Sequence, residues 1–423
     1  MGPGEYAAHD TVAETVRVEG ARILATLIRT VGDVQLAEDA VQEATLAALG
    51  AWPVTGVPPQ PRAWLTVTAR RMAIDALRRE RVRPDKERDG LRMIELARPD
   101  LPPDDVVNDD LLRLIFTCCH PALSPPTRVA LALRTLCGLS PSQIAGVLLT
   151  TEAATTKRLT RARQKIAAAH IPYRVPAEGE LADRLPAVCA VIHSLYTAGH
   201  APVDGHAAYD VDACTEAIRL AELLHGLLPD QPMPAAVLAL LLLTEARRPA
   251  RLDERGAVVT LDRQDRGRWD TAAIGRGIAL LNDSLRGSQG QADAYQLQAA
   301  IAAEHARAAG YDDTDWTEIV RLYDLLMSIA PSHAAGLGRV VAAAEAAGPA
   351  TALAMLAELP PNPRWHAVRA ELLAREGRYT EAADALAESL EGPATQPERQ
   401  HRERRRQSFL QLAEPPDDGD RIG

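Results

Sequence analysis

The chain has few aromatic residues. They make up 4% of its 423 residues, and only two of them are phenylalanines. Runs that alternate apolar and polar residues, the pattern of half-buried strands, are hard to find, whereas alanine and leucine, both strong helix formers, dominate the composition. A β-sandwich or barrel is therefore disfavoured, and we expect an all-α chain with room for two or three domains.

Long hydrophobic runs are also missing. The longest apolar stretch, Ala235–Leu243, has nine residues, far fewer than the roughly 20 that span a bilayer. The N-terminus shows no basic segment followed by an apolar one. We therefore expect no secretory signal, no membrane partner and a cytoplasmic location.

The few cysteines show no metal-binding pattern. No CxxC pair occurs, which favours buried thiols in a reducing compartment over a disulfide framework. Cys118, Cys119 and His120 are consecutive, but neighbouring side chains on a helix point about 100° apart. We expect no metal and no cofactor. The five cysteines are Cys118, Cys119, Cys137, Cys189 and Cys214.

Catalytic motifs are absent as well. The sequence contains no glycine-rich phosphate loop, no HExxH and no nucleophile elbow. His193, His200 and His206 have neither triad nor ligand spacing. We therefore expect no catalytic residue and no enzymatic activity.

Charge is distributed unevenly along the chain. The formal net charge is −10, but residues 1–175 carry a balance of +3 and the remainder a balance of −13. Residues 62–83 contain seven arginines, and residues 157–165 contain five basic residues without an acid. Two concentrated basic stripes in a nearly neutral region indicate contact with nucleic-acid phosphates, although solvated helix faces would also produce such runs.

The segment around residues 34–61 predicts an amphipathic helix followed by a stiff loop. The loop, from Trp52 to Pro61, contains four prolines and Gly56, and prolines lower the entropy cost of ordering it. One face of the helix offers a compact acidic and amide surface formed by Glu38, Asp39, Gln42 and Glu43. The opposite face carries an apolar stripe at helical spacing, made of Leu36, Ala37, Ala40, Val41, Ala44 and Ala48.

A second helix is expected from about Arg62, and a linker follows it. Residues 85–105 are polar and rich in proline, which separates a first domain, residues 10–84, from a second, residues 106–172. Five polar or charged residues share one face of this helix. These are Thr68, Arg71, Asp75, Arg78 and Arg79.

The second domain ends in a pattern typical of a helix-turn-helix. The residues are LSPSQIAGVLLTTEAATTKRLTRARQKI, from Leu139 to Ile166. The apolar residues of the first helix are expected to pack against those of the second, which leaves the polar side of the second helix outward. They are Ile144, Ala145 and Leu148 in the first helix, and Leu159, Ala162 and Ile166 in the second. The N-terminal part of that helix would then face base edges, and its arginines the DNA backbone.

These segments together resemble a known family. Residues 10–170 look like a group IV sigma factor of bacterial RNA polymerase, the extracytoplasmic-function class of the sigma-70 family. EDAVQEATLAAL, from Glu38 to Leu49, is similar to the segment that binds the clamp helices of the largest polymerase subunit. PRAWLTVTARRMAIDALRRERVR, from Pro61 to Arg83, resembles the segments that melt and read the −10 element, and the preceding loop resembles one that captures an unstacked base.

The resemblance implies partners and site residues. The partners are core RNA polymerase, including the flap of its second-largest subunit, and promoter DNA. The core-binding residues are Glu38, Asp39, Gln42 and Glu43. The −10 residues are Trp52, Arg62, Trp64, Arg70, Arg71, Asp75, Arg78 and Arg79, of which Trp64 is equally open to interpretation as a core residue. The −35 residues are Thr156, Lys157, Arg158, Thr160, Arg161, Arg163 and Lys165.

One position departs from the pattern of the −35 domain. Thr155 stands where the family commonly has a larger apolar residue. The −35 sequence preference is therefore left open, while phosphate contact by the arginines of this helix is still expected.

The rest of the chain resembles the sigma subgroup with a C-terminal tetratricopeptide-like extension. The likeness lies in LIFTCCHPALSPPTRVALALRTLCGLS (114–140), EAIRLAELLHGLLPD (216–230), LLLLTEARRPARLD (240–253) and DRQDRGRWDTAAI (262–274), while residues 188–205 are more polar than usual there. We expect a helical extension over 180–290, tetratricopeptide-like repeats over 291–412 and a disordered tail over 413–423. In AVRAELLAREGRYTEAADALAESL (367–390), Gly377 and Tyr379 are spaced as in such a hairpin.

Two alternatives stay open. A helix-turn-helix regulator with a tetratricopeptide-type sensor domain would share the second domain, but would not need the separate basic segment at 62–83. The extension could offer a concave surface to a protein partner, or be a bundle without one. We expect it to regulate the sigma half in cis, because its acidic balance contrasts with the basic stripes.

Overall fold

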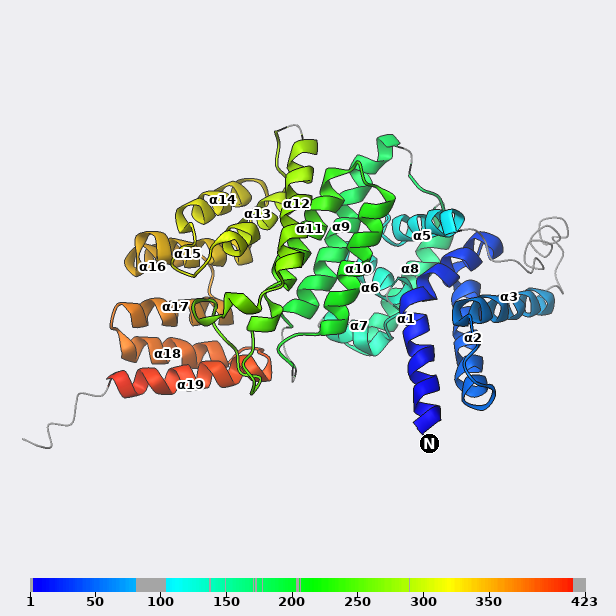
Figure 1. Cartoon of the computed structure of the whole chain (residues 1–423), viewed down its shortest axis with the longest axis horizontal. Coiled ribbons are helices and arrows are strands. Elements are labelled where there is room, and N and C mark those ends of the chain that lie inside the picture. Colours follow the sequence, from blue (N-terminus) through cyan, green and yellow to red (C-terminus); the bar gives the residue numbers. More distant parts are fainter. Residues whose placement is uncertain are drawn as a thin grey trace, which may run out of the picture. The chain divides into compact units, whose positions relative to one another are not determined.

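The computed structural model describes residues 3–80 and 104–413, except for the single positions 137, 149, 170, 172, 177, 203, 204, 206 and 289. Throughout these described ranges the chain forms helices joined by turns, without a β-strand, which confirms the expected all-α class (Figure 1). It divides into two compact units, residues 1–195 and residues 196–423. None of the helices described is both long enough and apolar enough to cross a membrane. Residues 414–423 of the predicted tail and residues 85–103 of the predicted linker lie outside the described residues. Ala413 is the last residue of α19 and Asp104 the first of α5, so the predicted tail begins one residue too early and the predicted linker ends two residues too late.

The first unit begins with three helices that pack on one another: α1 (Pro3–Val31), α2 (Val34–Thr55) and α3 (Pro61–Glu80). Gly32, with φ 73°, forms the turn between α1 and α2. Asp33 caps α2, because its carboxylate accepts the N–H of Leu36 at 2.9 Å. The predicted alanine periodicity of α2 is confirmed. The shared core contains Ile23, Leu24, Leu27, Ala37, Ala40, Ala44, Ala48, Leu65 and Ala69.

Four further helices form a second group in this unit: α5 (Asp104–Cys118), α6 (Pro125–Thr135), α7 (Pro141–Val147) and α8 (Glu152–Ala168). The helices α7 and α8 pack on each other as the predicted helix-turn-helix. Ile144 and Ala145 of α7 are buried, as are Leu159 and Ala162 of α8. Leu148 and Ile166, the other two residues of the predicted pairing, are half-buried. The burial therefore agrees with the prediction for four of the six residues.

A buried carboxylate joins the two helix groups of the first unit. Asp110 in α5 has an exposed fraction of 0%, and its Oδ2 lies 2.9 Å from Nε of Arg29 in α1. Nη1 of Arg113 lies 3.0 Å from the other carboxylate oxygen. The Tyr173 hydroxyl donates to the carbonyl oxygens of Ala25 and Asp110, both at 3.0 Å. Removing one partner of such a buried pair typically costs about 3–5 kcal/mol, because the other charge is left buried without a partner.

The second unit opens with the last turn of α9 (Glu178–His200), followed by α10 (Val211–Leu227), α11 (Pro232–Glu245) and α12 (Thr271–Gly287). Residues 234–243 of α11 are all buried, because α10, α12 and α13 pack around it. The loop between α11 and α12 contains three short 3-10 helices, η1 (Arg248–Ala250), η2 (Leu261–Arg263) and η3 (Arg266–Arg268).

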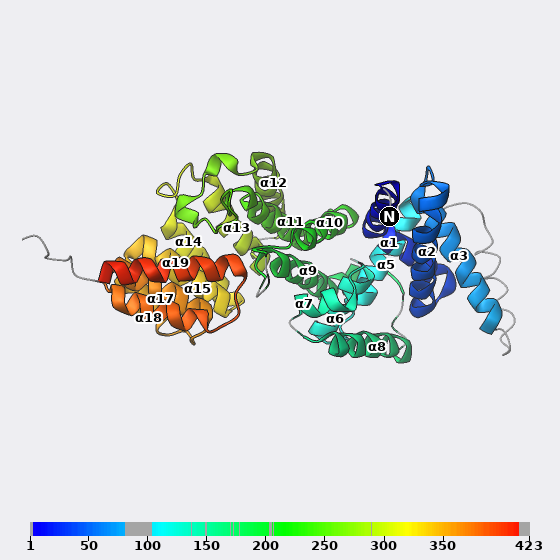
Figure 2. The same ribbon diagram turned by 90° about the horizontal axis from the view of Figure 1, so that it is seen from below.

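Seven more helices follow in the described residues of this unit, and each packs on the next along the chain (Figure 1 and Figure 2). Consecutive pairing of this kind is the architecture of helical repeats. Gly377, with φ 74°, turns α17 into α18, which confirms the predicted hairpin over 367–390. The helices are α13 (Ala294–Arg307), α14 (Trp316–Ile329), α15 (His333–Ala347), α16 (Pro349–Leu356), α17 (Pro363–Arg375), α18 (Tyr379–Leu390) and α19 (Gln396–Ala413).

Candidate functional site

The exposed side of α2 carries a small acidic surface. The side chains of Asp39, Gln42 and Glu43 are exposed, as the sequence predicts. Leu46, one turn further along the same side, is 67% exposed. It is missing from the predicted set, although a leucine on the polar side of an amphipathic helix is the signal that points to it. We call these four residues the α2 surface.

Glu38 does not share this surface, and its predicted placement there is wrong. Its side chain is 6% exposed and forms an ion pair with Arg163 of α8. Burial raises the pKa of Glu38, while Arg163 and Arg134 oppose that rise. Sequence periodicity could not reveal this, because the partner that covers Glu38 lies 125 residues further along the chain.

Trp52 lies inside α2 and not in the loop that follows, so the predicted start of that loop is wrong. Its side chain is 1% exposed, and its ring packs edge-on against Trp64, with ring centroids 5.6 Å apart. Trp64 is half-buried. The contact supports the core interpretation of Trp64, and it leaves Trp52 without a free face for a DNA base in this conformation.

The helix α3 presents part of the predicted −10 set to solvent. Arg71 and Asp75 are exposed, one turn apart, while Arg70 is half-buried. Nε of Arg62 lies 3.5 Å from Oε2 of Glu19 in α1, so this arginine forms an ion pair with α1. The side chains of Arg78 and Arg79 lie outside the described residues.

The helix α8 exposes several polar side chains. Its N-terminus is capped by Thr151, whose hydroxyl accepts the N–H of Ala154 at 3.2 Å. Arg158 and Arg163 are half-buried, and Arg163 is engaged by Glu38. The other predicted −35 residues are exposed as expected: Thr156, Lys157, Thr160, Arg161 and Lys165.

Thr155, the position that departs from the family pattern, is fully buried at 0% exposure. Its Oγ1 has no hydrogen-bond partner. A buried hydroxyl without a partner is costly, so the site is built for an apolar side chain. The departure therefore affects the packing of α8 and not its exposed face.

Of the consecutive residues Cys118, Cys119 and His120, the two cysteines are part of the core and the histidine is half-buried. Cys118 Sγ lies 2.9 Å from Oγ1 of Thr135. Burial raises the pKa of Cys118 to about 12, and burial also raises the pKa of Cys119. Protonated thiols are poor metal ligands. In the parts of the chain for which structure is given, no three His, Cys, Asp or Glu residues are grouped to hold a metal ion.

Two arginine-containing motifs of the extension, residues 240–253 and 262–274, contact each other in the second unit. The guanidinium carbons of Arg247 and Arg266 lie 5.4 Å and 4.9 Å from the centroid of the Trp269 ring. Arg266 also donates to the carbonyl oxygens of His305 and Ala308, both at 2.6 Å. These contacts fix the loop between α11 and α12 to the end of α13, so the motifs have a structural role.

Two known protein families match the parts of the chain that contain these surfaces. Residues 16–83 match Sigma-70 region 2, and residues 113–166 match Sigma-70, region 4. The α2 surface lies in the first match and α8 in the second. Residues 184–285 match a family of unknown function, DUF6596.

Curated relatives cover either most of the chain or less than half of it. An uncharacterized protein of Rhizobium meliloti (strain 1021) is 39% identical over 375 residues, which cover 87% of this chain and 88% of the relative. The probable ECF RNA polymerase sigma factor SigI of two Mycobacterium tuberculosis strains is 32% identical over 184 residues, 42% of this chain and 61% of the relative. No solved structure matches the chain.

Proposed function

We propose that this chain, which belongs to the sigma-70 family and is similar to ECF RNA polymerase sigma factors, directs core RNA polymerase to promoters by reading the −35 and −10 elements and opening the DNA. A region 2 domain and a region 4 domain on one chain carry this proposal. Sigma factors bind core polymerase and promoter DNA and are not enzymes. We therefore assign the phosphodiester chemistry to the polymerase, and we place the chain in the cytoplasm.

The α2 surface is the proposed contact with the clamp helices of the largest polymerase subunit. Its acidic side chains are exposed beside an exposed leucine, a combination of charge and apolar area that suits a protein partner. By family resemblance, the region 4 half reaches the flap of the second-largest subunit.

The −10 element is assigned to α3 and the −35 element to α8. On α3, exposed Arg71 and Asp75 face solvent together with Thr68, which is half-buried. On α8, exposed Thr156 and Lys157 lie in the N-terminal half, where helix-turn-helix proteins contact base edges. Arg158 and Arg161 then contact phosphates, which gives affinity without sequence information.

The ion pair between Glu38 and Arg163 suggests that the first unit opens when it binds its partners. Arg163 belongs to the proposed −35 set, and Glu38 lies next to the α2 surface. A −35 contact by Arg163 requires it to leave Glu38, so promoter binding and this closed contact exclude each other. Core polymerase supplies the binding energy for this change by engaging the α2 surface.

The extension is the proposed regulator of the sigma half in cis. Its acidic balance of −13 contrasts with the two basic stripes of the first 175 residues. Transcription from the cognate promoter should then differ between the full chain and a truncation near Pro176. Identical activity and identical polymerase affinity would contradict cis regulation while leaving the sigma function intact.

Transcription of fragmented genomic DNA by core polymerase, measured with and without this chain, tests the proposed function. We expect new transcription starts in the presence of the chain, preceded by a shared pair of sequence elements. Promoter binding by the chain alone, without any effect on core polymerase, would favour the helix-turn-helix regulator.

We also propose the domain bounds expected from the sequence, which are residues 10–84, 106–172, 180–290 and 291–412. Limited proteolysis of the chain would test them, because cleavage should occur between these domains.

A further inference from the structure

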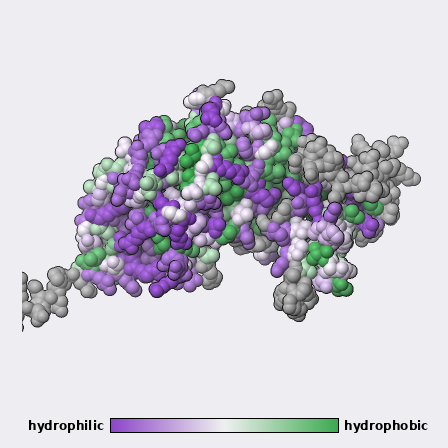
Figure 3. Space-filling model, in the orientation of Figure 1, coloured by the Kyte–Doolittle hydropathy of each residue, from purple (hydrophilic) through white to green (hydrophobic). Residues whose placement is uncertain are grey.

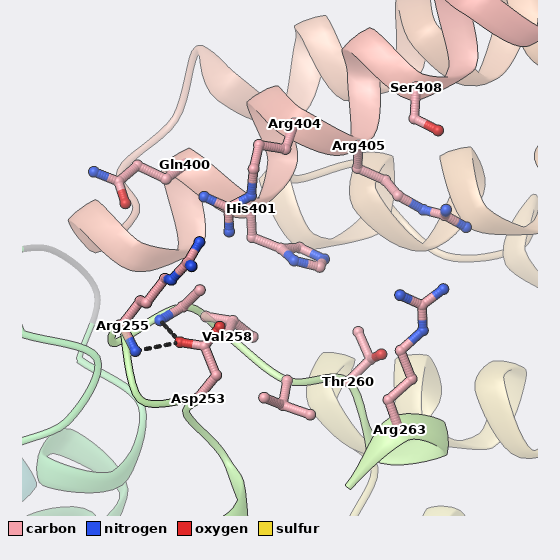
Figure 4. A pocket seen from close by; sticks show the side chains of 12 residues that line it. Asp253, Arg255, Val258, Thr260, Arg263, Gln400, His401, Arg404, Arg405 and Ser408 are labelled. Carbon is pink, nitrogen blue, oxygen red and sulfur yellow. Dashed lines mark hydrogen bonds between the residues drawn. The ribbon is translucent and has the colours of Figure 1, made fainter.

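A cavity of about 550 Å³ lies within the second unit, between the loop of residues 253–263 and α19 (Figure 4). On the α19 side its lining residues lie one turn apart, so they share one face of the helix. These residues are Gln400, His401, Arg404, Arg405 and Ser408. The size falls within the range of about 300–1,000 Å³ that is usual for small-molecule sites.

The loop side of the cavity is held in shape by its own hydrogen bonds. The Asp253 carboxylate accepts the backbone N–H groups of Arg255 at 2.9 Å and Ala257 at 2.8 Å. Gly256 adopts φ 75° at the tip, a conformation that other residues rarely adopt. The Asp253 charge is therefore already engaged by the loop, and the loop presents Arg255 to the cavity.

The lining is strongly cationic. It contains Arg255, Arg263, Arg404 and Arg405 against the single carboxylate of Asp253. Arg405 is paired with Glu371 at 2.8 Å, and Arg263 lies 3.9 Å from Asp262. Within the described ranges, no ion pair joins Arg255 or Arg404 to a carboxylate. Figure 4 shows the arginine side chains extending into the space between the loop and α19.

We propose that this cavity binds a small anion that carries phosphate groups. The planar guanidinium fork matches phosphate oxygens and forms charge-assisted hydrogen bonds with them. The hydroxyls of Thr260 and Ser408, which also line the cavity, add neutral donors. The proposal concerns the extension alone and does not depend on the sigma function.

Larger polyanions and apolar peptides fit the cavity less well. Proteins that bind single-stranded nucleic acid stack its bases on aromatic side chains, and the lining contains no Phe, Tyr or Trp. The face of the unit around α18 and α19 is largely hydrophilic (Figure 3), which disfavours an apolar peptide. A compact ligand whose charge matches the arginines is therefore the best fit.

Isothermal titration calorimetry of the full chain tests the proposal, with inorganic pyrophosphate as the probe. We expect saturable binding at one site in 0.15 M salt, with a dissociation constant below about 1 mM. The double variant Arg255→Gln/Arg404→Gln should weaken binding at least about tenfold, because it removes two charge-assisted contacts. Neither side chain makes a described ion pair, so thermal unfolding should be unchanged.

A matched control removes the same charge elsewhere in the unit. Arg286 and Arg321 have exposed side chains, at 73% and 60%, and Arg286→Gln/Arg321→Gln should leave pyrophosphate binding unchanged. Equal weakening by both double variants would overturn the proposal, since it would indicate general charge attraction. No saturable binding, equal affinity for citrate, or tighter binding of a short single-stranded oligonucleotide would overturn it as well.

Discussion

Arg163 of α8 donates a hydrogen bond to the carboxylate of Glu38 in α2, a residue 125 positions earlier in the sequence, and so joins the two helices. Glu38 is 6% exposed, and its second oxygen, Oε1, has no hydrogen-bond partner. The pair is therefore a buried contact with incomplete hydrogen bonding, a type that contributes little net stability. It is well suited to be exchanged for contacts with polymerase and DNA.

Glu38→Gln should strengthen core polymerase binding by about fivefold. The substitution keeps the shape of the side chain but removes the charge that holds Arg163, so the open form of the first unit becomes more populated. Binding of fluorescently labelled chain to core polymerase measures the effect. Glu152→Gln, which removes an exposed carboxylate at the start of α8, should have no effect. If Glu38→Gln instead weakens binding, Glu38 itself contacts the polymerase.

Gln42→Ala combined with Glu43→Ala should weaken core binding by about tenfold, equivalent to about 1.4 kcal/mol, without changing promoter choice. Both side chains are exposed, so the loss would come from the interface and not from folding. Adding Leu46→Ala should weaken binding further. Arg161→Ala on α8 provides the reciprocal control: it should reduce promoter binding and leave core affinity intact. Altered promoter preference with normal core affinity would contradict the α2 assignment.

Thr155→Val should raise the free energy of unfolding by about 1 kcal/mol, because it replaces a buried hydroxyl without a partner by a methyl group of similar size. Denaturant unfolding of the full chain, followed by circular dichroism, measures the change. Thr156→Val, at the next and exposed position, should leave stability nearly unchanged. A destabilised Thr155→Val variant would show that the hydroxyl has a partner, such as a buried water.

The stability of the second unit should fall as the pH drops below about 6.5. Burial, Arg251 and Arg247 lower the pKa of His200 to about 3, and Nη1 of Arg251 lies 3.0 Å from Nε2 of this ring. Between the unfolded pKa of about 6.5 and the folded pKa, the unfolded state binds the extra proton. His200 alone should therefore cost about 2 kcal/mol between pH 7 and pH 5.

Denaturant unfolding at both pH values, for the wild-type chain and for His200→Gln, isolates this contribution. The variant should lose less stability on acidification by about the same 2 kcal/mol. Equal losses in the two proteins would show that His200 is not held neutral in the folded state.

Local patterns predicted much of the fold. The alanine spacing of α2 and the helix-turn-helix of α7 and α8 follow from periodicity, since each buries one face. The hairpin of α17 and α18 follows from Gly377, because only glycine readily adopts φ 74° between two helices. The exposure of Asp39, Gln42 and Glu43 follows from the same helical spacing.

Features that depend on distant packing could not be predicted. The loop expected from Trp52 onward begins only after Thr55, although Pro53 lies inside α2 and proline disfavours a helix interior. Packing of Trp52 against Trp64 outweighs this local preference. The burial of Glu38 likewise depends on Arg163, a residue that no local pattern connects to it.

Co-elution with core RNA polymerase in the absence of DNA tests the central claim most directly. We predict that the full chain comigrates with core polymerase in size-exclusion chromatography, and that Gln42→Ala/Glu43→Ala shifts most of the chain to the free fraction. A chain that elutes apart from core polymerase at micromolar concentrations, while it still binds promoter DNA by itself, would contradict the account.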